Sequence, residues 1–289
     1  MRGQLITNNR VYYPMDIYAE TTRFYESVKT KKWIVGKSVF GRNLYAVKAG
    51  EGRPVGLVQC AMHGREWITA KLAFEQYRVG LKKGTCWFLP LVNPDGALLS
   101  QVGLNSVEDE RARAVLLAMN GENDDFSLWK ANGRGVDLNV NFPAKWGTGV
   151  KNVRAAASEN YIGETPLSEP ETRALKVFTE EISPDYTVSY HTKGEEIYWY
   201  FYQDLQLLER DRRLAGILAK MTGYPLAEAK GSAGGYKDWC IEHFNIPAFT
   251  IEVGKDELCH PLGEAALEDI IEKNRFAIDR LSKEIEKIQ

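Results

Sequence analysis

The stretch "VGLVQCAMHGREW", residues 55–67, joins the pattern of a buried strand to the beginning of a helix. Residues 55–62 are a short and mainly apolar run, which is typical of a strand buried on both faces of a sheet. The residues that follow carry apolar side chains at helical spacing, at Ile68, Leu72 and Val79. His63 therefore lies directly after a strand, and Glu66 opens the helix that comes next.

Strand-like runs and amphipathic segments alternate along the rest of the 289 residues. Further buried strands are predicted at "TCWFLPLV" (85–92), "DYTVSY" (185–190) and "AFTIEV" (248–253). A helix is predicted over residues 168–183, where Ser168 is the expected cap and Glu171 completes a capping box. Residues 263–289 predict one long amphipathic helix. This βαβα order favours a single-domain α/β sandwich over residues 1–289, with a largely parallel or mixed sheet.

Two segments do not fit this alternation. Residues 100–160 are polar, rich in glycine and asparagine and only weakly periodic, and residues 228–238, "EAKGSAGGYKD", are rich in glycine. Long irregular segments inside a compact domain are more often functional than idle. We expect both segments to lie over the carboxyl ends of the strands, where open α/β sheets bind ligands.

The composition is that of an ordinary globular protein, with 44% hydrophobic and 26% charged residues and a net charge of −2. There is no long basic block, so a nucleic-acid partner is not expected. No apolar run reaches the roughly 18 residues of a membrane helix, so a membrane partner is not expected either. The first residues lack the apolar core of a signal peptide, which predicts a cytoplasmic protein unless a leader has been removed.

The four cysteines are widely spaced in apolar contexts, at Cys60, Cys86, Cys240 and Cys259. This pattern favours buried, reduced thiols over a disulfide framework. The sequence has no CxxC pair, so a zinc site built from thiolates is not expected.

His63 and Glu66 are three residues apart, and a turn can bring their side chains to one point. An imidazole nitrogen and a carboxylate oxygen are both common zinc ligands. In the alternative interpretation, Glu66 only caps the helix and the histidine beside it is incidental.

A third ligand has to come from elsewhere in the chain. His191 follows a predicted strand just as His63 does, whereas His243 lies in a helical pattern and His260 precedes a proline. We therefore favour His191 as the third member of a site with two histidines and one glutamate. Catalytic zinc sites of this kind leave the fourth position for water.

A water molecule in such a site needs a base. The segment "PAFTIEVG" places Glu252 in an otherwise apolar strand, where a carboxylate is costly unless it is paired or functional. The alternative is that Glu252 simply faces outward, with Thr250 on the same face of the strand. Beside a metal ion, desolvation would tune Glu252 for proton transfer.

The motifs "HGREW", "GVDLNVNF", "SYH" and "FTIEVG" occur in this order and resemble the zinc carboxypeptidase (M14) family over roughly residues 55–255. The resemblance implies an eight-stranded mixed sheet between helices and one zinc ion per chain. The implied zinc ligands are His63, Glu66 and His191. It also implies that Glu252 is the general base and then the general acid, that Asp137 orients the first zinc histidine, and that Asn139 contacts a substrate carboxylate.

The sequence departs from the family pattern at several positions. Family exopeptidases have Asn-Arg-Asn where residues 139–141 are Asn-Val-Asn, so the arginine that holds a peptide's C-terminal carboxylate is missing. The tyrosine that covers the substrate in the family matches Lys230 here, and the specificity-pocket position matches Lys237, just before Asp238. The arginine that polarises the scissile carbonyl has two candidates for its role, Lys130 and Arg134.

These features, together with "GSAGGYKDW", resemble the bacterial subgroup that cleaves γ-D-glutamyl–diamino-acid bonds in cell-wall peptides. Diaminopimelate has an additional amine and carboxylate at the far end of its side chain, and Lys237 is placed to hold that carboxylate. We therefore expect a preference for γ-D-glutamyl–meso-diaminopimelate over lysine peptides, in muropeptide recycling if the protein is cytoplasmic. The alternatives are a carboxypeptidase for ordinary peptides, which Val140 argues against, a related zinc deacylase, and a non-catalytic peptide-binding homologue.

Overall fold

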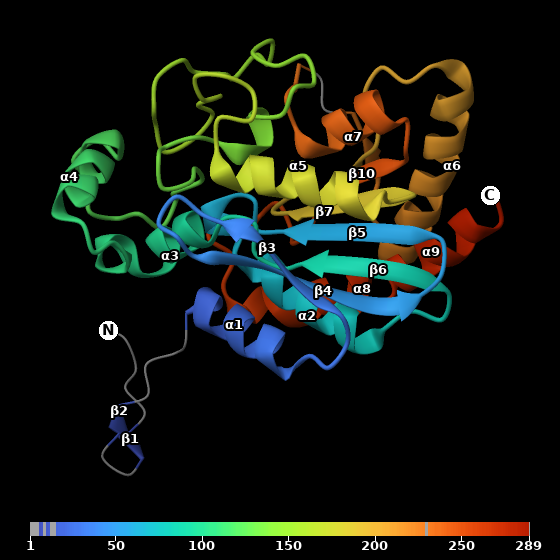
Figure 1. The fold of residues 1–289 in the computed structure, drawn as a ribbon, viewed down its shortest axis with the longest axis horizontal. Coiled ribbons are helices and arrows are strands. Elements are labelled where there is room, and N and C mark those ends of the chain that lie inside the picture. The colour runs from blue at the N-terminus through green and yellow to red at the C-terminus, as the bar shows by residue number, and fades with distance from the viewer. Residues whose placement is uncertain (1–5, 8–9, 12–15, 229–230, 289) are drawn as a thin grey trace.

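One mixed sheet of eight strands, counted within the described part of the chain, runs through the middle of the molecule (Figure 1). The computed structural model describes residues 6–7, 10–11, 16–228 and 231–288. The sheet contains, in spatial order, β3 (Lys32–Lys37), β4 (Asn43–Glu51), β6 (Gly84–Leu89), β5 (Val55–Cys60), β7 (Tyr186–His191), β10 (Ala248–Glu252), β8 (Glu196–Tyr198) and β9 (Leu226–Ala227). A separate antiparallel pair consists of β1 (Ile6–Thr7) and β2 (Arg10–Val11).

The central strands β6, β5, β7 and β10 run parallel to one another. They are the strands predicted near residues 55–62, 85–92, 185–190 and 248–253, and the prediction is confirmed. Nearly all of their residues are buried, because helices cover both faces of the sheet. Their parallel register brings the carboxyl ends of all four to the same edge of the sheet.

The sequence pattern does not predict the positions of the outer strands. β4 runs antiparallel to β6 and β8 runs antiparallel to β10, which makes the sheet mixed. β3 alternates between exposed and half-buried residues, and β8 and β9 are only 3 and 2 residues long. Such edge strands lack the continuous apolar run by which the central strands are recognised.

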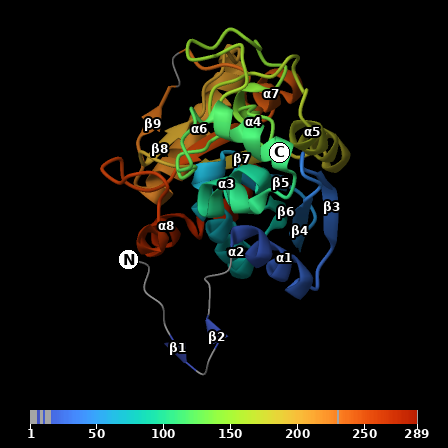
Figure 2. The ribbon, with the colours of Figure 1, turned by 90° about the vertical axis from the view of Figure 1, so that its left-hand side faces the viewer.

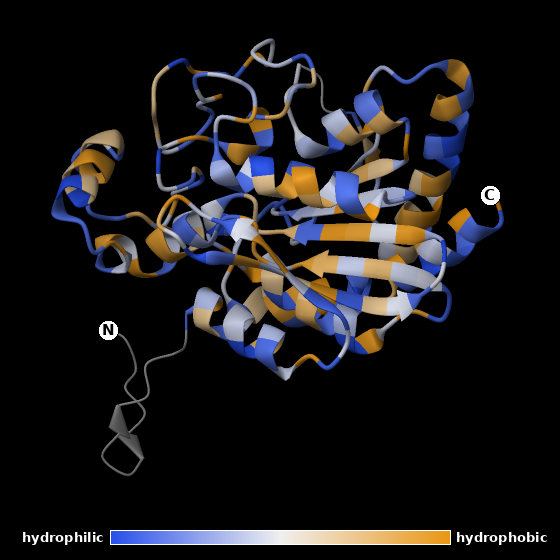
Figure 3. Cartoon of the chain, viewed as in Figure 1, coloured by the Kyte–Doolittle hydropathy of each residue, from blue (hydrophilic) through white to orange (hydrophobic). Residues whose placement is uncertain are grey.

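Helices form a layer on each face of the sheet (Figure 2). One layer contains α1 (Ile17–Ser27), α2 (Ile68–Val79), α6 (Leu205–Thr222), α8 (Leu267–Asn274) and α9 (Ala277–Glu286). The other contains α5 (Pro170–Ile182) and α7 (Tyr236–Phe244). Val58 belongs to the first core and its neighbour Leu57 to the second, as the alternation of side chains along a strand requires. The apolar colouring of β5 and β6 in Figure 3 marks the sheet between the two cores.

The segment between β6 and α5 carries α3 (Pro94–Val102) and α4 (Glu110–Met119) and is otherwise largely irregular. It has its own small apolar cluster, in which Leu99, Phe126 and Trp129 are buried. This is the polar segment that the sequence predicted over the strand ends, and its loop at residues 129–141 contacts Gly64 and His63 just after β5.

The prediction of a single helix over residues 263–289 is wrong, because the structure has two helices there, α8 and α9. The break follows Asn274, whose carbonyl oxygen accepts a hydrogen bond from Gln76 Nε2 at 3.0 Å. The Asn274 side chain donates to Tyr224 Oη at 3.0 Å. These contacts to α2 and to a residue just after α6 hold Asn274 at a turn, and the amphipathic pattern alone does not reveal them.

The capping box predicted for the helix at residues 168–183 is also wrong. α5 begins at Pro170, a residue suited to the first helical position, and the residue before it forms no side-chain cap. Ser168 Oγ donates to Glu169 Oε1 at 2.8 Å. Glu171 is buried, and its carboxylate accepts hydrogen bonds from Val39 N at 3.0 Å and Asn132 Nδ2 at 3.1 Å. Glu171 therefore ties α5 to two loops instead of capping its own helix.

The cysteines are free thiols, and Cys60, Cys86 and Cys240 are buried as expected. Cys259 is exposed, so the expectation of burial is wrong for this residue, which lies in a loop after β10. None of the described helices has both the length and the apolar character that crossing a bilayer demands.

Candidate metal centre

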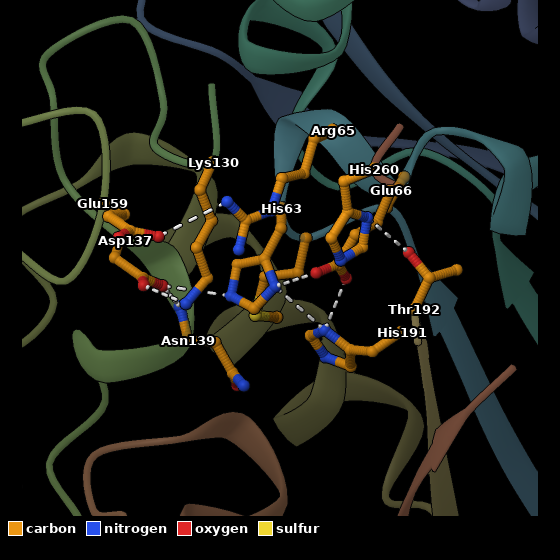
Figure 4. A network of polar contacts seen from close by, with 12 residues as sticks. His63, Arg65, Glu66, Lys130, Asp137, Asn139, Glu159, His191, Thr192 and His260 are labelled. Carbon is orange, nitrogen blue, oxygen red and sulfur yellow. Dashed lines mark hydrogen bonds and ion pairs between the residues drawn. The ribbon is translucent and has the colours of Figure 1, made fainter. Parts of the chain in front are cut away.

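His63, Glu66 and His191 lie together at the edge of the sheet where β5 and β7 end (Figure 4). β5 and β7 are parallel neighbours, with Cys60 opposite Tyr190, so the residues that follow them meet in space. Glu66 belongs to a 3-10 turn, η1 (Gly64–Glu66), that turns its carboxylate back towards His63. All three side chains are buried, and one ligand atom of each lies within 4.8 Å of the others.

The nitrogen and oxygen atoms of this cluster converge on one point. His63 Nδ1 lies 2.8 Å from Glu66 Oε1, and His191 Nδ1 lies 2.9 Å from Glu66 Oε2. The two Nδ1 atoms are 3.1 Å apart. Two imidazole nitrogens and a carboxylate facing one another in a buried place form a donor set for a cation, and nitrogen with oxygen ligands suit zinc.

Asp137 fixes the orientation of the His63 ring. Its Oδ1 lies 3.1 Å from His63 Nε2, and its Oδ2 lies 2.8 Å from Lys130 Nζ. Lys130 and His63 outweigh the effect of burial and hold the pKa of Asp137 well below its ordinary value. Asp137 is therefore an acceptor, so His63 Nε2 donates to it and the lone pair of neutral His63 Nδ1 faces the cluster.

The charges in the cluster compensate one another. Burial opposes the positive charge on His63, but Glu66 and Asp137 outweigh it and raise the pKa of this histidine. Burial likewise opposes the negative charge on Glu66, but His63 and His191 hold the pKa of Glu66 well below its ordinary value. The site thus stabilises an ionised Glu66 and positive charge beside it, which is the electrostatic environment that a metal cation needs.

Gly64 lets the neighbouring segments approach the cluster. Its N–H donates to the carbonyl of Lys130 at 2.9 Å. A Cβ atom at this position would lie 2.4 Å from Gly96 O and 2.8 Å from Trp129 O, which are both backbone atoms. Only glycine therefore allows α3 and the loop that carries Lys130 to pack against η1.

The two candidates for carbonyl polarisation lie in different places. Lys130 is bonded to Asp137 and lines the same cavity as His63 and Glu252. The Arg134 side chain is 56% exposed, its Nη1 is 3.9 Å from Glu169 Oε2, and it does not line that cavity. The fold brings Lys130 to the cluster and leaves Arg134 outside it.

Glu252 ends β10 next to His191, its register partner on β7. The residue is partly exposed, but its Oε2 atom is buried and has no hydrogen-bond partner among the described residues. Burial, with smaller contributions from the charges of Glu66 and Glu196, raises the pKa of Glu252 to about 8, although the charges of His191 and Lys130 act to lower it. The side chain lines the cavity, which excludes the alternative of a residue on an outer surface.

The cavity beside the cluster has a volume of about 350 Å³. The residues proposed from the sequence for substrate binding line it, namely Asn139, Lys237 and Asp238. Lys230 lies outside the described residues. The sequence did not point to Tyr198, Lys151 or Asn152, which also line the cavity. Thr250 lines it too, and its alternation with Glu252 along β10 is the signal that could have identified it.

The remaining histidines lie outside the cluster. His243 on α7 stacks on Trp239, with ring centroids 5.6 Å apart. His260 lies beside the cluster in Figure 4, where its Nδ1 is 3.4 Å from Thr192 Oγ1 and burial lowers its pKa to about 4. Of the three other histidines, His191 is the one whose ligand atom groups with those of His63 and Glu66 among the described residues, within 4.8 Å.

The chain matches known proteins in sequence and in fold. The family model "Zinc carboxypeptidase" matches residues 17–277. "Gamma-D-glutamyl-L-diamino acid endopeptidase 1" of Lysinibacillus sphaericus is 31% identical over 249 residues, which cover 80% of this chain and 62% of that protein. The chain spans about three fifths of the length of this and similar curated relatives.

Solved structures agree with this match. Murein-tripeptide amidase from Escherichia coli O157 is 26% identical, with a TM-score of 0.59 over 90% of this chain and 95% of that one. Bovine thrombin-activatable fibrinolysis inhibitor is 19% identical, with a TM-score of 0.77 over 95% of this chain and 98% of that one, and this likeness concerns the fold. From the family match over residues 17–277, together with the eight-stranded mixed sheet found here, we conclude that the chain belongs to the zinc carboxypeptidase family.

Proposed function

We propose that this chain hydrolyses the amide bond between γ-D-glutamate and meso-diaminopimelate in cell-wall peptides, with one zinc ion held by His63, Glu66 and His191. The observation that carries the proposal is the convergence of these three ligand groups beside a cavity that also contains Glu252. We further propose that residues 1–289 act as one catalytic unit, because the strands that carry the site belong to one sheet.

The proposed reaction adds water across the amide bond. Bound zinc supplies a Lewis acid that lowers the pKa of water towards about 7. Glu252, whose Oε2 atom has no partner among the described residues, accepts a proton from the attacking water. Lys130 stabilises the negative charge that develops on the carbonyl oxygen. Glu252 then gives its proton to the departing amine, which leaves the γ-carboxylate of glutamate and free diaminopimelate.

The residues around the cavity support a cell-wall peptide as the substrate. Val140 occupies the position where an arginine would hold the C-terminal carboxylate of an ordinary peptide, and it offers no charge for that purpose. Lys237 lines the cavity and offers a cation to the far carboxylate of diaminopimelate. Two relatives named above are a γ-D-glutamyl-L-diamino acid endopeptidase and a murein-tripeptide amidase, and their names support the same substrate class. For a cytoplasmic protein the role would be muropeptide recycling.

The test is a digest of synthetic L-Ala-γ-D-Glu-meso-diaminopimelate beside a panel of ordinary peptides, analysed by mass spectrometry. We expect L-Ala-D-Glu and diaminopimelate as products, loss of hydrolysis with a chelator, and recovery with about one zinc ion per chain. Release of C-terminal residues from ordinary peptides, with the γ-D-glutamyl peptide intact, would instead support a carboxypeptidase. A purified protein that binds no zinc and hydrolyses nothing would support the non-catalytic alternative.

A further inference from the structure

Lys237 and Asp238 form an ion pair in the wall of the cavity. Lys237 Nζ lies 2.6 Å from Asp238 Oδ1. The two residues are only 6% and 3% exposed, yet both line the cavity that contains His63 and Glu252. The sequence predicted a cationic pocket, but the structure pairs the cation with an anion, so this part of the wall is neutral overall and carries both signs of charge.

Each member of the pair retains capacity for a ligand. Lys237 Nζ donates to Asp238 Oδ1 and, at 3.0 Å, to the carbonyl of Tyr200, which uses two of its three N–H groups within the described residues. Asp238 Oδ2 accepts from Gly235 N at 3.2 Å, and each carboxylate oxygen has a second lone pair. The pair can therefore accept a donor and donate to an acceptor without losing its own contacts.

The sheet beneath the cavity is polar as well. Thr250 lines the cavity, and Ser189 and Gln59 are its successive register partners on β7 and β5, so the three side chains share one face of the sheet. Ser189 Oγ and both amide atoms of Gln59 are buried without a partner in the described part of the chain. Ser189 and Gln59 are not among the residues that line the cavity, so of these three side chains Thr250 is the one that can offer a polar group to a ligand there.

We infer that Lys237 and Asp238 together recognise a zwitterion, the ammonium and carboxylate at the far end of the diaminopimelate side chain. This inference rests on the proposed function. Lys237 donates to the carboxylate and Asp238 accepts from the ammonium, so both substrate charges are paired. A side chain with only one of these charges leaves the site with one unbalanced charge. Lysine offers an ammonium to Asp238 but no carboxylate to Lys237, and a side chain with only the far carboxylate offers no ammonium to Asp238.

The experiment compares three substrates, L-Ala-γ-D-Glu-X. In these, X is meso-diaminopimelate, L-2-aminopimelate without the far ammonium, or L-lysine without the far carboxylate. We expect kcat/KM for the diaminopimelate substrate to exceed kcat/KM for either analogue by at least about tenfold, because each analogue lacks one charged hydrogen bond. Equal hydrolysis of diaminopimelate and either analogue overturns the inference and leaves the proposed function standing. Hydrolysis of none of the three overturns both.

Two variants assign the charges to the residues. Lys237→Met is expected to bring the diaminopimelate-to-lysine ratio of kcat/KM close to one. Asp238→Asn, which keeps an acceptor for Gly235 N, is expected to bring the diaminopimelate-to-aminopimelate ratio close to one. Lys151→Met is the matched control, because Lys151 is an exposed lysine of the same cavity, and both ratios should persist in it. Variants that slow all three substrates equally assign the pair a structural role and overturn the inference.

Discussion

At the scale of the residue, Glu252 combines a buried carboxylate oxygen with a position at the end of β10. Its Oε2 atom is buried without a partner among the described residues, and burial raises its pKa to about 8. It also ends its strand beside His191. A carboxylate in this position is costly for the fold and well suited to moving a proton.

Replacing Glu252 with glutamine should separate metal binding from catalysis. Glu252→Gln keeps the size of the side chain and all three proposed ligands, so we expect about one zinc ion per chain. The loss of the proton acceptor should lower kcat by about 10²–10⁴-fold. Metal analysis and steady-state kinetics on the same sample test this, and near-normal turnover in the zinc-loaded variant would contradict the assignment.

Lys130 and Arg134 provide a matched pair of cations. Because Lys130 lines the cavity and Arg134 does not, Lys130→Met should lower kcat by about 10²–10³-fold and Arg134→Met should have little effect. Lys130 also pairs with Asp137, so Lys130→Arg is needed as a control that keeps this contact. Equal losses in Lys130→Met and Arg134→Met would disprove the distinction.

At the scale of elements, the cluster of proposed metal ligands depends on how closely α3 and the loop at residues 129–141 pack against η1. Gly64→Ala places a Cβ 2.4 Å from the backbone oxygen of Gly96, so we expect a loss of about 1–3 kcal/mol in the free energy of unfolding. Gly216→Ala is the control, because Gly216 lies within α6 with open space around it, and it should stabilise by about 0.5–1 kcal/mol. Urea unfolding compares the two, and equal midpoints would contradict this account.

The position of Glu171 on α5 predicts a pH dependence of stability. Burial and the nearby charge of Asp95 raise the pKa of Glu171 from 4.5 to about 7. The folded protein therefore holds this proton more tightly than the unfolded chain. The stabilising effect is complete below pH 4.5 and is lost as the pH rises through about 7.

Glu171→Gln should remove this dependence, since glutamine does not titrate. Between pH 5 and 7.5 the wild-type free energy of unfolding should fall by about 2 kcal/mol relative to the variant. Urea unfolding of both proteins across this range measures the difference. Parallel stability curves would show that Glu171 titrates at its ordinary value in the folded protein.

At the scale of the whole molecule, the proposed zinc ligands join residues that are far apart in the chain, because His63 and Glu66 lie 128 and 125 positions before His191. Zinc that binds only the folded protein should therefore stabilise the entire domain, by about 4 kcal/mol at a thousandfold excess over Kd. We expect a chelator to lower the unfolding temperature of the wild type. His191→Ala should not respond to the chelator, and an identical midpoint with and without chelator in the wild type would contradict the site.

The sequence was sufficient for the parts of the molecule that local pattern determines. Apolar runs identified the four central strands, and the residues after two of them, His63 and His191, met as expected because parallel neighbours end at one edge. Contacts between segments that are far apart in the chain could not be predicted from local sequence patterns. The Gln76–Asn274 contact that divides the last helix spans 198 positions, and the bond between Val39 and Glu171 that replaces the predicted capping box spans 132. Lys237 lines the cavity, but the geometry of its pairing with Asp238 depends on the fold of α7, which the sequence pattern does not reveal.

Strand ends and loops contribute different parts of the site, and this has a consequence for how the substrate specificity of such an enzyme changes. Glu252 and the three proposed ligands are placed by the strand ends and η1, whereas much of the cavity wall comes from loop residues at 139–152 and 231–235 and from the start of α7. Insertions or exchanges in these outer segments alter what is recognised while the hydrolytic centre keeps its geometry. Substrate specificity can thus change during evolution, or by grafting of loops, while the sheet that carries the proposed ligands stays the same.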